Sequence, residues 1–408
     1  MRTISLEQLG SILGGVGSNP RVMASGNFAT PYTLLNAVDS HLPEYRLHML
    51  NAHGELPKRD GVTYETAFIG PAMRDPKTHY IPARLSLLPL LLKNHYRPDI
   101  VLIQTSPKHH NTVSLGIECN VIPAAIEATR EHGGIVIAQA NPKMPYTYGD
   151  AQIYETDIDF LVECEEDLTT IEPGPLDDVS HQIGTLIADR IADGSTLQLG
   201  IGAVPDAVVR SLVDRKGFRV WTEMFSDGVL ALHENGALDE DIPLVASFIF
   251  GSRRLYDWLD RNKKVRINRT EVTNNPGNIE RQPQMTSVNA ALQVDLFDQA
   301  NASRIKGHIY TGFGGSTDFI VGALHSRGGQ SFIALPSWHP KADVSTIVPL
   351  IDEPITSFQH SAVTTEQGIA ECFGHTQAQQ ASNIIEQAAH PDARDHLTQA
   401  AYEMAIFN

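Results

Sequence analysis

The clearest signal of fold lies in residues 196–205, Thr196-Leu197-Gln198-Leu199-Gly200-Ile201-Gly202-Ala203-Val204-Pro205. The residues before the first glycine form a short, mainly apolar run, which is typical of a strand in a parallel sheet. Two glycines then permit a tight turn, and the proline that follows suits the first turn of a helix. A strand, a glycine turn and a helix in this order leave backbone N–H groups facing outward, where the helix dipole favours an anion. A plain tight turn explains the same residues, because the spacing is not GxGxxG and no Walker lysine follows.

The alternation of strand and helix continues through most of the chain. Residues 99–104 and 134–139 are short, β-branched and apolar, as expected of strands that are buried on both faces. Residues 121–128, between them, predict a helix with proline in its first turn, and residues 330–335 predict a further strand. The sequence therefore predicts an α/β fold with mainly parallel sheets.

A weak internal repeat in the sequence predicts two such domains in tandem. In residues 21–31 and 196–205 a glycine precedes a proline by five residues, and apolar residues follow the proline at helical spacing. Any strand–turn–helix unit has some of this likeness, which is the alternative explanation. A chain of 408 residues also exceeds the usual size of one core. The acidic, proline-containing stretch 165–179 is the predicted linker, and 180–192 the helix after it, so we expect domains at 1–179 and 180–408.

Composition excludes several classes of function. A net charge of -17 argues against non-specific nucleic-acid binding, and it requires local positive potential at any site for an anion. The cysteines Cys119, Cys164 and Cys372 form no CxxC motif, which indicates a reducing compartment. No charged-then-apolar leader opens the chain and no apolar run approaches 18 residues, so we expect a cytoplasmic protein that does not span a membrane. The pair His109-His110 lacks the further ligands that a metal site needs, so no metal is expected.

Two segments contain candidate residues for catalysis or ligand binding. Residues 222–228 place the carboxylate of Glu223 at the end of an apolar run, just before a turn, although a surface glutamate in this position is common. Residues 311–319 contain Gly312, Gly314 and Gly315, which permit positive φ angles and close approach of the backbone to a ligand. Such a loop can donate N–H groups to a developing oxyanion, whereas a β-turn with a glycine bulge is the structural alternative.

Taken together, these segments resemble the acetyl-CoA hydrolase/transferase family (family I CoA-transferases), and most closely its 4-hydroxybutyrate CoA-transferases. The likeness spans nearly the whole chain, and the combination of motifs is specific although single motifs are not. The segments that carry it are residues 106–107, 114–116, 141–145, 193–205, 222–228, 250–257, 287–290, 293–296, 312–319, 365–370 and 389–392.

The resemblance implies a role for each matching residue. It implies that Glu223 is the catalytic glutamate and that Gly26, Asn274, Gly314, Gly315 and Glu366 orient groups or stabilise an oxyanion. The Ser25-Gly26-Asn27 turn, with Gly26 at its centre, is expected to help to shape the acyl pocket. The residues that the resemblance assigns to coenzyme A are Gly200, Ile201, Gly202, Ala203, Val204, Gly312, Gly315 and, with a less secure match, Lys341.

The chain departs from the family pattern at three places. Val321 stands where relatives usually carry arginine, and residues 345–349 read Ser-Thr-Ile-Val-Pro in place of Ser-Arg-Ile-Val-Pro. Residues 357–360 replace a proline-arginine pair. These losses leave the glutamate untouched but put contacts to the cofactor phosphates and the choice of acid in question.

The implied reaction moves coenzyme A between an acyl-CoA and a short-chain carboxylate such as 4-hydroxybutyrate, butyrate or acetate. Coenzyme A is then a substrate that passes through a covalent thioester on Glu223, with ping-pong kinetics. Two alternatives stay open, an acyl-CoA hydrolase that uses the same glutamate and a non-catalytic acyl-CoA-binding protein. The general prevalence of two-fold assemblies predicts a homodimer.

Overall fold

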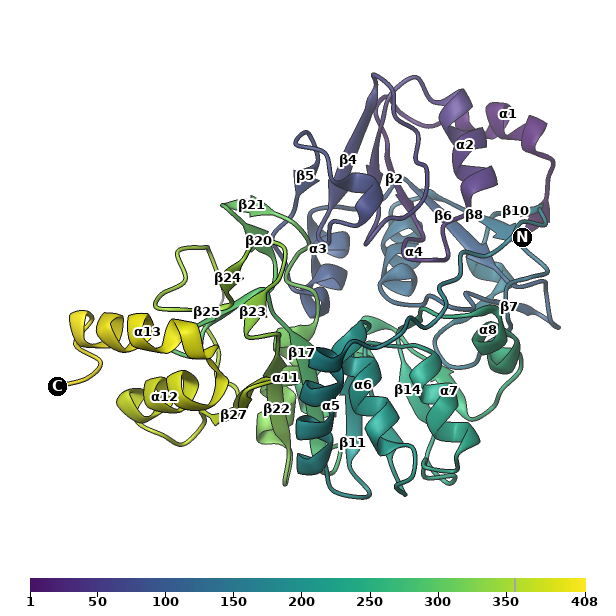
Figure 1. The fold of residues 1–408 in the computed structure, drawn as a ribbon. Coiled ribbons are helices and arrows are strands. Elements are labelled where there is room, and N and C mark those ends of the chain that lie inside the picture. The colour runs from purple at the N-terminus through teal and green to yellow at the C-terminus, as the bar shows by residue number, and fades with distance from the viewer. Residues whose placement is uncertain (356) are drawn as a thin grey trace. The chain divides into compact units, whose positions relative to one another are not determined.

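The computed structural model describes residues 1–355 and 357–408. The chain forms two compact units, coloured along the sequence in Figure 1. Unit 1 comprises Met1–Glu172, Pro243–Thr273 and Thr311–Gly314, and unit 2 comprises Pro173–Ile242, Asn274–Tyr310 and Gly315–Asn408. Each unit contains one main, mostly parallel sheet, which agrees with the predicted fold class.

Unit 1 is built on an eight-stranded sheet in the order β1-β10-β8-β6-β2-β3-β4-β5, and every neighbouring pair is parallel. The predicted strands 99–104 and 134–139 correspond to β6 and β8. The strand bounds are β1 (Arg2–Thr3), β2 (Arg21–Ala24), β3 (Tyr45–His48), β4 (Val62–Thr66), β5 (His79–Tyr80), β6 (Ile100–Thr105), β8 (Ile135–Ala140) and β10 (Phe160–Glu163).

Helices and small sheets complete unit 1. All six residues of β6 are buried, as expected of a central strand covered on both faces. Further elements are α1 (Leu9–Leu13), α2 (Tyr32–His41), α3 (Leu88–Asn94), α4 (Ile122–Glu131), α8 (Arg253–Leu259), α9 (Thr270–Thr273) and β15 (Phe248–Ile249), with the pairs β7 (Thr112–Ser114) and β9 (Gln152–Tyr154), and β14 (Leu244–Ala246) and β16 (Val265–Ile267).

Unit 2 is built on a six-stranded sheet in the order β12-β11-β17-β22-β26-β27, parallel except for the last pair. Figure 1 shows α5 and α6 side by side against this sheet. Gly184 of α5 permits that packing, because a Cβ there would lie 2.4 Å from the Cβ of Ala207 in α6. The bounds are α5 (Asp178–Arg190), β11 (Thr196–Leu199), α6 (Ala203–Leu212), β12 (Arg219–Val220), β17 (Met285–Ala290), β22 (Gln330–Ala334), β26 (Ala362–Thr365) and β27 (Gly368–Glu371).

The other elements of unit 2 surround this sheet. They include the segment from α12 to α13, which packs its apolar residues into one core with those of β22 and β26. Their bounds are β13 (Met224–Phe225), α7 (Asp227–Glu234), α10 (Pro276–Ile279), β18 (Gln293–Asp295), β19 (Ala300–Asn301), β20 (Arg304–Ile305), β21 (His308–Ile309), α11 (Ser316–His325), β23 (Trp338–His339), β24 (Val344–Ser345), β25 (Ile347–Val348), α12 (Gln377–Asn383), a π-helical segment (Ile384–Ala388) and α13 (Pro391–Glu403).

Both sheets reverse their strand order at one point. In unit 1 the chain leaves β2 toward β3 and later returns to add β6 on the other side, and in unit 2 it does the same from β11 to β12 and then to β17. Loops that diverge at such a reversal open a crevice at the carboxyl ends of the strands, where open α/β sheets bind ligands. The two segments of the weak internal repeat correspond to β2 with α2 and to β11 with α6. Each of them therefore contributes the strand at which the order of its sheet reverses.

The units do not follow the predicted division at residue 179. Residues 243–273 and 311–314 join unit 1, although they come after the start of the second predicted domain. Isolated bridges from Glu118 to Phe248 and from Asn120 to Arg269 tie the first of these segments to unit 1. Because these bridges join residues more than 100 positions apart, no local pattern in the sequence predicts them.

None of the helices in the described part of the chain combines the length and the apolar character needed to cross a membrane.

Gly26 provides a test of the unit 1 switch point. A Cβ at this position would lie 2.0 Å from the backbone oxygen of Leu50, so the turn after β2 requires a glycine. We predict that Gly26→Ala lowers the free energy of unfolding by about 1–3 kcal/mol through overpacking. Thermal unfolding followed by circular dichroism measures the effect. Gly17→Ala, whose Cβ would meet nothing within 4 Å, is the matched control, and equal melting temperatures for the two variants would contradict the close approach.

Candidate active site

Glu223 lies at the carboxyl edge of the unit 2 sheet, in the bend between β12 and β13. The Thr222 hydroxyl donates to the backbone oxygen of Leu199, 3.2 Å away, and to that of Met224, 2.8 Å away. Because Leu199 is the last residue of β11, these bonds hold Glu223 beside Gly200, at the switch point of the sheet. The predicted strand-end carboxylate therefore lies where this fold places ligands.

Asn274 is the hydrogen-bond partner of Glu223. Its Nδ2 donates to Oε2 of the carboxylate over 2.7 Å, and Asn274 itself is fully buried. The start of α10 fixes its position, because Asn275 is the N-cap, with its side chain accepting from the N–H of Gly277, and Pro276 is the first helical residue. The asparagine that the family resemblance singled out thus contacts the predicted nucleophile directly.

Gly315 packs against both of these side chains. It is the N-cap of α11, and a Cβ on it would lie 1.8 Å from Glu223 Oε2 and 2.1 Å from Asn274 Nδ2. Its φ of -112° is ordinary, so proximity and not backbone torsion demands a glycine here. The helices α10 and α11 pack closely, since a Cβ on Gly322 would lie 2.5 Å from Ile279 and 3.1 Å from the backbone oxygen of Pro276.

The environment of Glu223 favours the neutral acid more than water does. Burial raises the pKa of Glu223 to about 7, the hydrogen bond from Asn274 opposes that rise, and the charge of Asp318 adds to it. Asp318 is fully buried in the first turn of α11. A carboxylate that is poorly solvated is a stronger nucleophile than one in water. Sequence reasoning gave Asp318 no role, although it lies within the glycine-rich segment that drew attention.

The loop between β11 and α6 borders the same edge. Gly202 is the N-cap of α6 and has a φ of 123°, a conformation that favours glycine. Ile201 beside it is 51% exposed, and Gly202 and Ala203 are also exposed. The loop therefore offers the free N–H groups of a ten-residue helix and an apolar side chain to solvent. This arrangement suits a ligand with both anionic and apolar parts.

Gly312 and Gly314 belong to unit 1 and have packing reasons to be glycine. A Cβ on Gly312 would lie 2.5 Å from the backbone oxygen of Ala67. Gly314 has a φ of 57°, and its backbone oxygen accepts from the N–H of Leu85 over 2.8 Å. Their contacts to an oxyanion or to coenzyme A stay predictions.

The structure gives Glu366 partners other than Glu223. Its carboxylate accepts from the backbone N–H of Ser337 over 2.9 Å, from the Ser337 hydroxyl, and from Gln367 over 3.1 Å. Burial raises the pKa of Glu366, but the hydrogen bonds led by Ser337 outweigh it and leave the pKa below its ordinary value. Lys341 is exposed in the turn between β23 and β24. The family roles of both residues stay predictions.

One departure from the family pattern has a structural function. His360, in the segment 357–360 where a departure from the family pattern is expected, is fully buried, and its Nδ1 lies 2.7 Å from Asp298 Oδ1. The backbone N–H of His360 also donates to Asp298, over 3.0 Å. This buried pair holds residues near the start of β26, so the replacement serves packing in unit 2.

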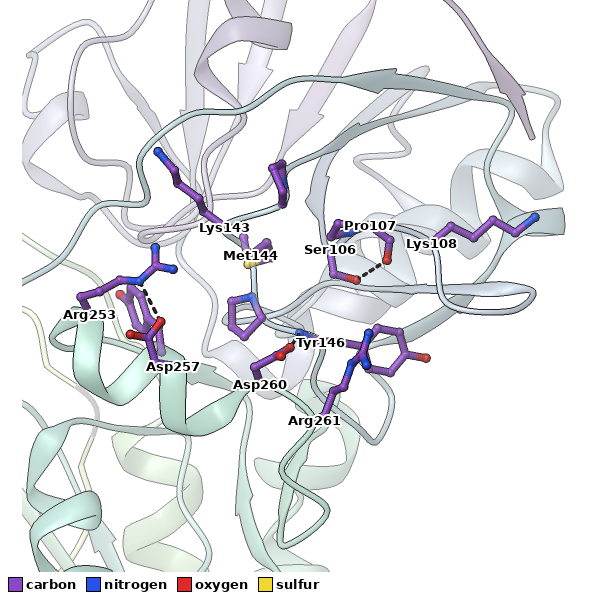
Figure 2. A pocket seen from close by; sticks show the side chains of 13 residues that line it. Ser106, Pro107, Lys108, Lys143, Met144, Tyr146, Arg253, Asp257, Asp260 and Arg261 are labelled. Atoms are coloured by element: carbon purple, nitrogen blue, oxygen red, sulfur yellow. Dashed lines mark hydrogen bonds and ion pairs between the residues drawn. The ribbon is translucent and has the colours of Figure 1, made fainter.

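Figure 2 shows a pocket of about 290 Å³ in unit 1, near the ends of β6 and β8. Arg253 is one of its cations and pairs with Asp257 over 2.8 Å. Lys143 pairs with Asp167 over 2.7 Å and Lys108 pairs with Glu155, so three of the cations already have carboxylate partners. The lining residues are Ser106, Pro107, Lys108, Pro142, Lys143, Met144, Pro145, Tyr146, Arg253, Tyr256, Asp257, Asp260 and Arg261.

Among the residues that the structure describes, no group of three or more His, Cys, Asp or Glu side chains is placed to hold a metal ion. His109 and His110 contact each other edge to face, with ring centroids 4.3 Å apart, and His109 also contacts Tyr146.

Comparisons with known proteins agree on one family. The family model for the acetyl-CoA hydrolase/transferase C-terminal domain matches residues 251–401. The 4-hydroxybutyrate coenzyme A transferase of Clostridium kluyveri is 34% identical over 94% of both chains. The succinyl-CoA:acetate/propanoyl-CoA:succinate CoA transferase of Fasciola hepatica is 34% identical over 96% of this chain and 86% of its own. The crystal structure of RipA from Yersinia pestis superposes with a TM-score of 0.90 at 26% identity, covering 100% of this chain and 98% of that one.

Gly315→Ala tests the packing around the carboxylate. The new methyl group would displace Glu223 from Asn274, and the pKa of Glu223 should rise above about 7 because the hydrogen bond that lowers it is lost. Any catalysis through Glu223 should fall about 100-fold, as for a reacting group displaced by about 1 Å. Carbon-13 NMR of labelled glutamate measures the pKa. Gly174→Ala, with nothing within 4 Å of the added Cβ, is the control, and an unchanged pKa in Gly315→Ala would refute the contact.

Asp318→Asn tests the electrostatic contribution to Glu223. Removal of a nearby negative charge favours the ionised carboxylate, so the pKa of Glu223 should fall below about 7. The same NMR titration reports the change, and the acidic limb of the pH–rate profile should move to lower pH with it. Asp214→Asn, at an exposed position in unit 2, should leave both unchanged. A pKa that stays constant or rises in Asp318→Asn would show that Asp318 does not act on Glu223.

Proposed function

The chain belongs to the acetyl-CoA hydrolase/transferase family and is an enzyme of the CoA-transferase type, and from this premise we propose that it transfers coenzyme A through a thioester on Glu223. The partners of the reaction are an acyl-CoA and a short-chain carboxylate of the 4-hydroxybutyrate, butyrate or acetate type. The name of the relative from Clostridium kluyveri includes the first of these acids, 4-hydroxybutyrate.

One observation carries the proposal. The Glu223 carboxylate is held at the switch point of a parallel sheet by Asn274 and by the backbone of Gly315, close to an exposed glycine loop at the start of α6. A carboxylate with a raised pKa and a fixed orientation, at the edge where such sheets bind ligands, suits a nucleophile better than a surface or structural glutamate.

The chemistry needs no general base. An ionised oxygen of Glu223 attacks the thioester carbonyl, the carbon–sulfur bond breaks, and coenzyme A leaves as a thiolate with an acyl-glutamyl anhydride behind it. The thiolate then attacks the glutamyl carbonyl, the anhydride carbon–oxygen bond breaks, and the free carboxylate leaves. An incoming carboxylate reverses both steps. Each nucleophile is already an anion and one negative charge is conserved throughout, so no proton has to move.

Positioning and oxyanion stabilisation must supply the acceleration, because a carboxylate is a modest nucleophile. An ordered site can contribute about 7–11 kcal/mol by proximity and orientation. Each N–H donor to the oxyanion of a tetrahedral intermediate is worth roughly 2.7–4 kcal/mol. The amide of Asn274 and the backbone N–H groups at the start of α11 are the nearest candidates to Glu223, since Asn274 and Gly315 both contact its carboxylate.

Hydrolysis is the competing activity, and it differs only in the acceptor. Water that reaches the enzyme-bound acyl or thioester group would release it, and exclusion of water from the site would prevent this. A labelled carboxylate distinguishes the two: a transferase forms labelled acyl-CoA and releases coenzyme A slowly without an acceptor acid. Release of coenzyme A at the same rate with and without an acceptor would indicate hydrolysis.

Glu223→Gln tests the role of the nucleophile. The amide keeps the volume of the side chain but cannot form the anhydride, so kcat for transfer should fall about 1000-fold or more while the fold is retained. Initial rates of the wild type should give parallel double-reciprocal lines, as ping-pong kinetics require. Glu234→Gln, at the end of α7, is the control and should keep its activity. Substantial transfer by Glu223→Gln would contradict the proposal. A wild-type protein that binds acyl-CoA but shows no turnover would contradict it as well.

A further inference from the structure

A closed triangle of hydrogen bonds joins Gln198, Ser287 and Asn289 in the sheet of unit 2. The Ser287 hydroxyl donates to Gln198 Oε1 over 2.6 Å. Asn289 Nδ2 donates to Ser287 Oγ over 2.9 Å and to Gln198 Oε1 over 3.3 Å. Gln198 is 4% exposed, Ser287 is fully buried and Asn289 is half-buried. The chemistry proposed for Glu223 gives these three polar side chains no role.

The triangle leaves one donor and one acceptor unused. Among the residues that the structure describes, neither Gln198 Nε2 nor Asn289 Oδ1 has a hydrogen-bond partner. Turning both side-chain amides over closes the same triangle and exchanges the two groups, so a free donor and a free acceptor remain in either orientation. Buried polar groups are rarely left unpaired in native proteins, so the triangle indicates a bound group that both accepts and donates.

The strand register brings the triangle to the edge of the sheet that carries Glu223. Leu199 pairs with Val288, so Asn289 is level with Gly200, at the carboxyl ends of β17 and β11. Glu223 follows β12, the neighbour of β11 on the other side. Because neighbouring strands are about 4.8 Å apart, Asn289 and Glu223 are separated by roughly 10 Å across β11.

The triangle also lies on the face of the sheet that α11 covers (Figure 1). Asn289 pairs with Ile333, and registered partners point to the same face. Ile333 shares one apolar core with Ile320 of α11. Gly315, at the start of the same helix, touches the Glu223 carboxylate. The triangle and the carboxylate therefore share one face and one edge, both within unit 2.

Coenzyme A contains the kind of group that the triangle lacks. An ethylene spacer separates the thioester sulfur from the nearest amide of its pantetheine arm. An amide offers an N–H donor and a carbonyl acceptor, whereas a phosphate only accepts and an alkyl group does neither. The triangle carries no charge, which suits a neutral amide better than an anion. An arm whose thioester meets Glu223 and which crosses Gly200 brings this amide to Gln198 and Asn289.

We propose that Gln198 and Asn289 hold the amide of coenzyme A nearest the thioester, with the free acceptor of the triangle taking its N–H. Ser287 is a positioning residue, because it fixes both side-chain amides without using a group of its own for the ligand. The inference rests on the transferase function of the preceding subsection and adds the residues that place the coenzyme A arm beside Glu223.

The test uses two acyl donors that differ in one group. They are an acyl thioester of pantetheine and its analogue with an ester oxygen in place of the amide N–H nearest the sulfur. The wild type should favour the amide donor about tenfold in kcat/KM, the value of one hydrogen bond. Asn289→Leu should bring this ratio close to one by slowing the amide donor, with the ester donor little changed. If either donor turns over too slowly, inhibition of the acyl-CoA reaction by the two compounds gives the same ratio.

Two serine variants provide the matched comparison. Ser331 is level with Ser287 in β22, and its buried hydroxyl makes no hydrogen bond to the triangle. Ser287→Ala should lower the ratio about threefold because Asn289 loses a partner that orients it, whereas Ser331→Ala should leave the ratio unchanged. It also keeps the test decisive if Asn289→Leu does not fold.

A wild-type ratio near one would show that water alone pairs with the triangle, and it would overturn the proposal. An equal loss for both donors in Asn289→Leu and Ser287→Ala would overturn it as well, since that is the effect of a purely structural role. Failure of the transferase function itself would appear separately, as transfer that persists in Glu223→Gln.

Discussion

The active site depends on a contact that only glycine permits. The backbone of Gly315 touches the Glu223 carboxylate and the Asn274 amide at once, and any side chain there would occupy the position of a carboxylate oxygen. Because Gly315 also starts α11, the same contact brings the buried charge of Asp318 into the environment of Glu223. Orientation and acidity of the carboxylate are thus set together by the packing of α10 on α11.

The strand order of the two sheets explains where the residues of the candidate site lie. Each unit reverses its strand order once, and each reversal carries a turn with a glycine, at Gly26 in unit 1 and at Gly200 and Gly202 in unit 2. Glu223 lies at the second reversal. The chain has a net charge of -17, so an anionic ligand must be attracted locally, and the free N–H groups at the start of α6 are suited to do so.

Local patterns in the sequence predicted most of the fold. The buried strands β6, β8 and β22 have the short apolar runs expected of parallel sheets, and α4 and α6 begin near their prolines. The helix expected at 180–192 is α5, which begins at Asp178 because Asp177 caps it. The segments 243–273 and 311–314 were assigned to the other part of the chain, since the pairing that holds them in unit 1 is remote in sequence.

The site was predicted less completely, for a related reason. A resemblance of motifs identified Glu223, Asn274 and Gly315, and the structure brings these three into contact. Burial and the charge of Asp318, which is distant in sequence, raise the pKa of Glu223, and no local pattern reveals either effect. Conversely, Gly312 and Gly314 belong to the glycine-rich segment 311–319 that matched the family, but the contacts around them are packing contacts within unit 1.

The covalent role of Glu223 is tested most directly by mass spectrometry of the protein after incubation with an acyl-CoA and no acceptor acid. The proposed mechanism predicts a mass increase equal to coenzyme A less one water, located on the peptide that contains Glu223 and removed by hydroxylamine. The Glu223→Gln variant should show no such increase. A preparation that transfers coenzyme A at its full rate yet never carries the adduct on this peptide would contradict the mechanism.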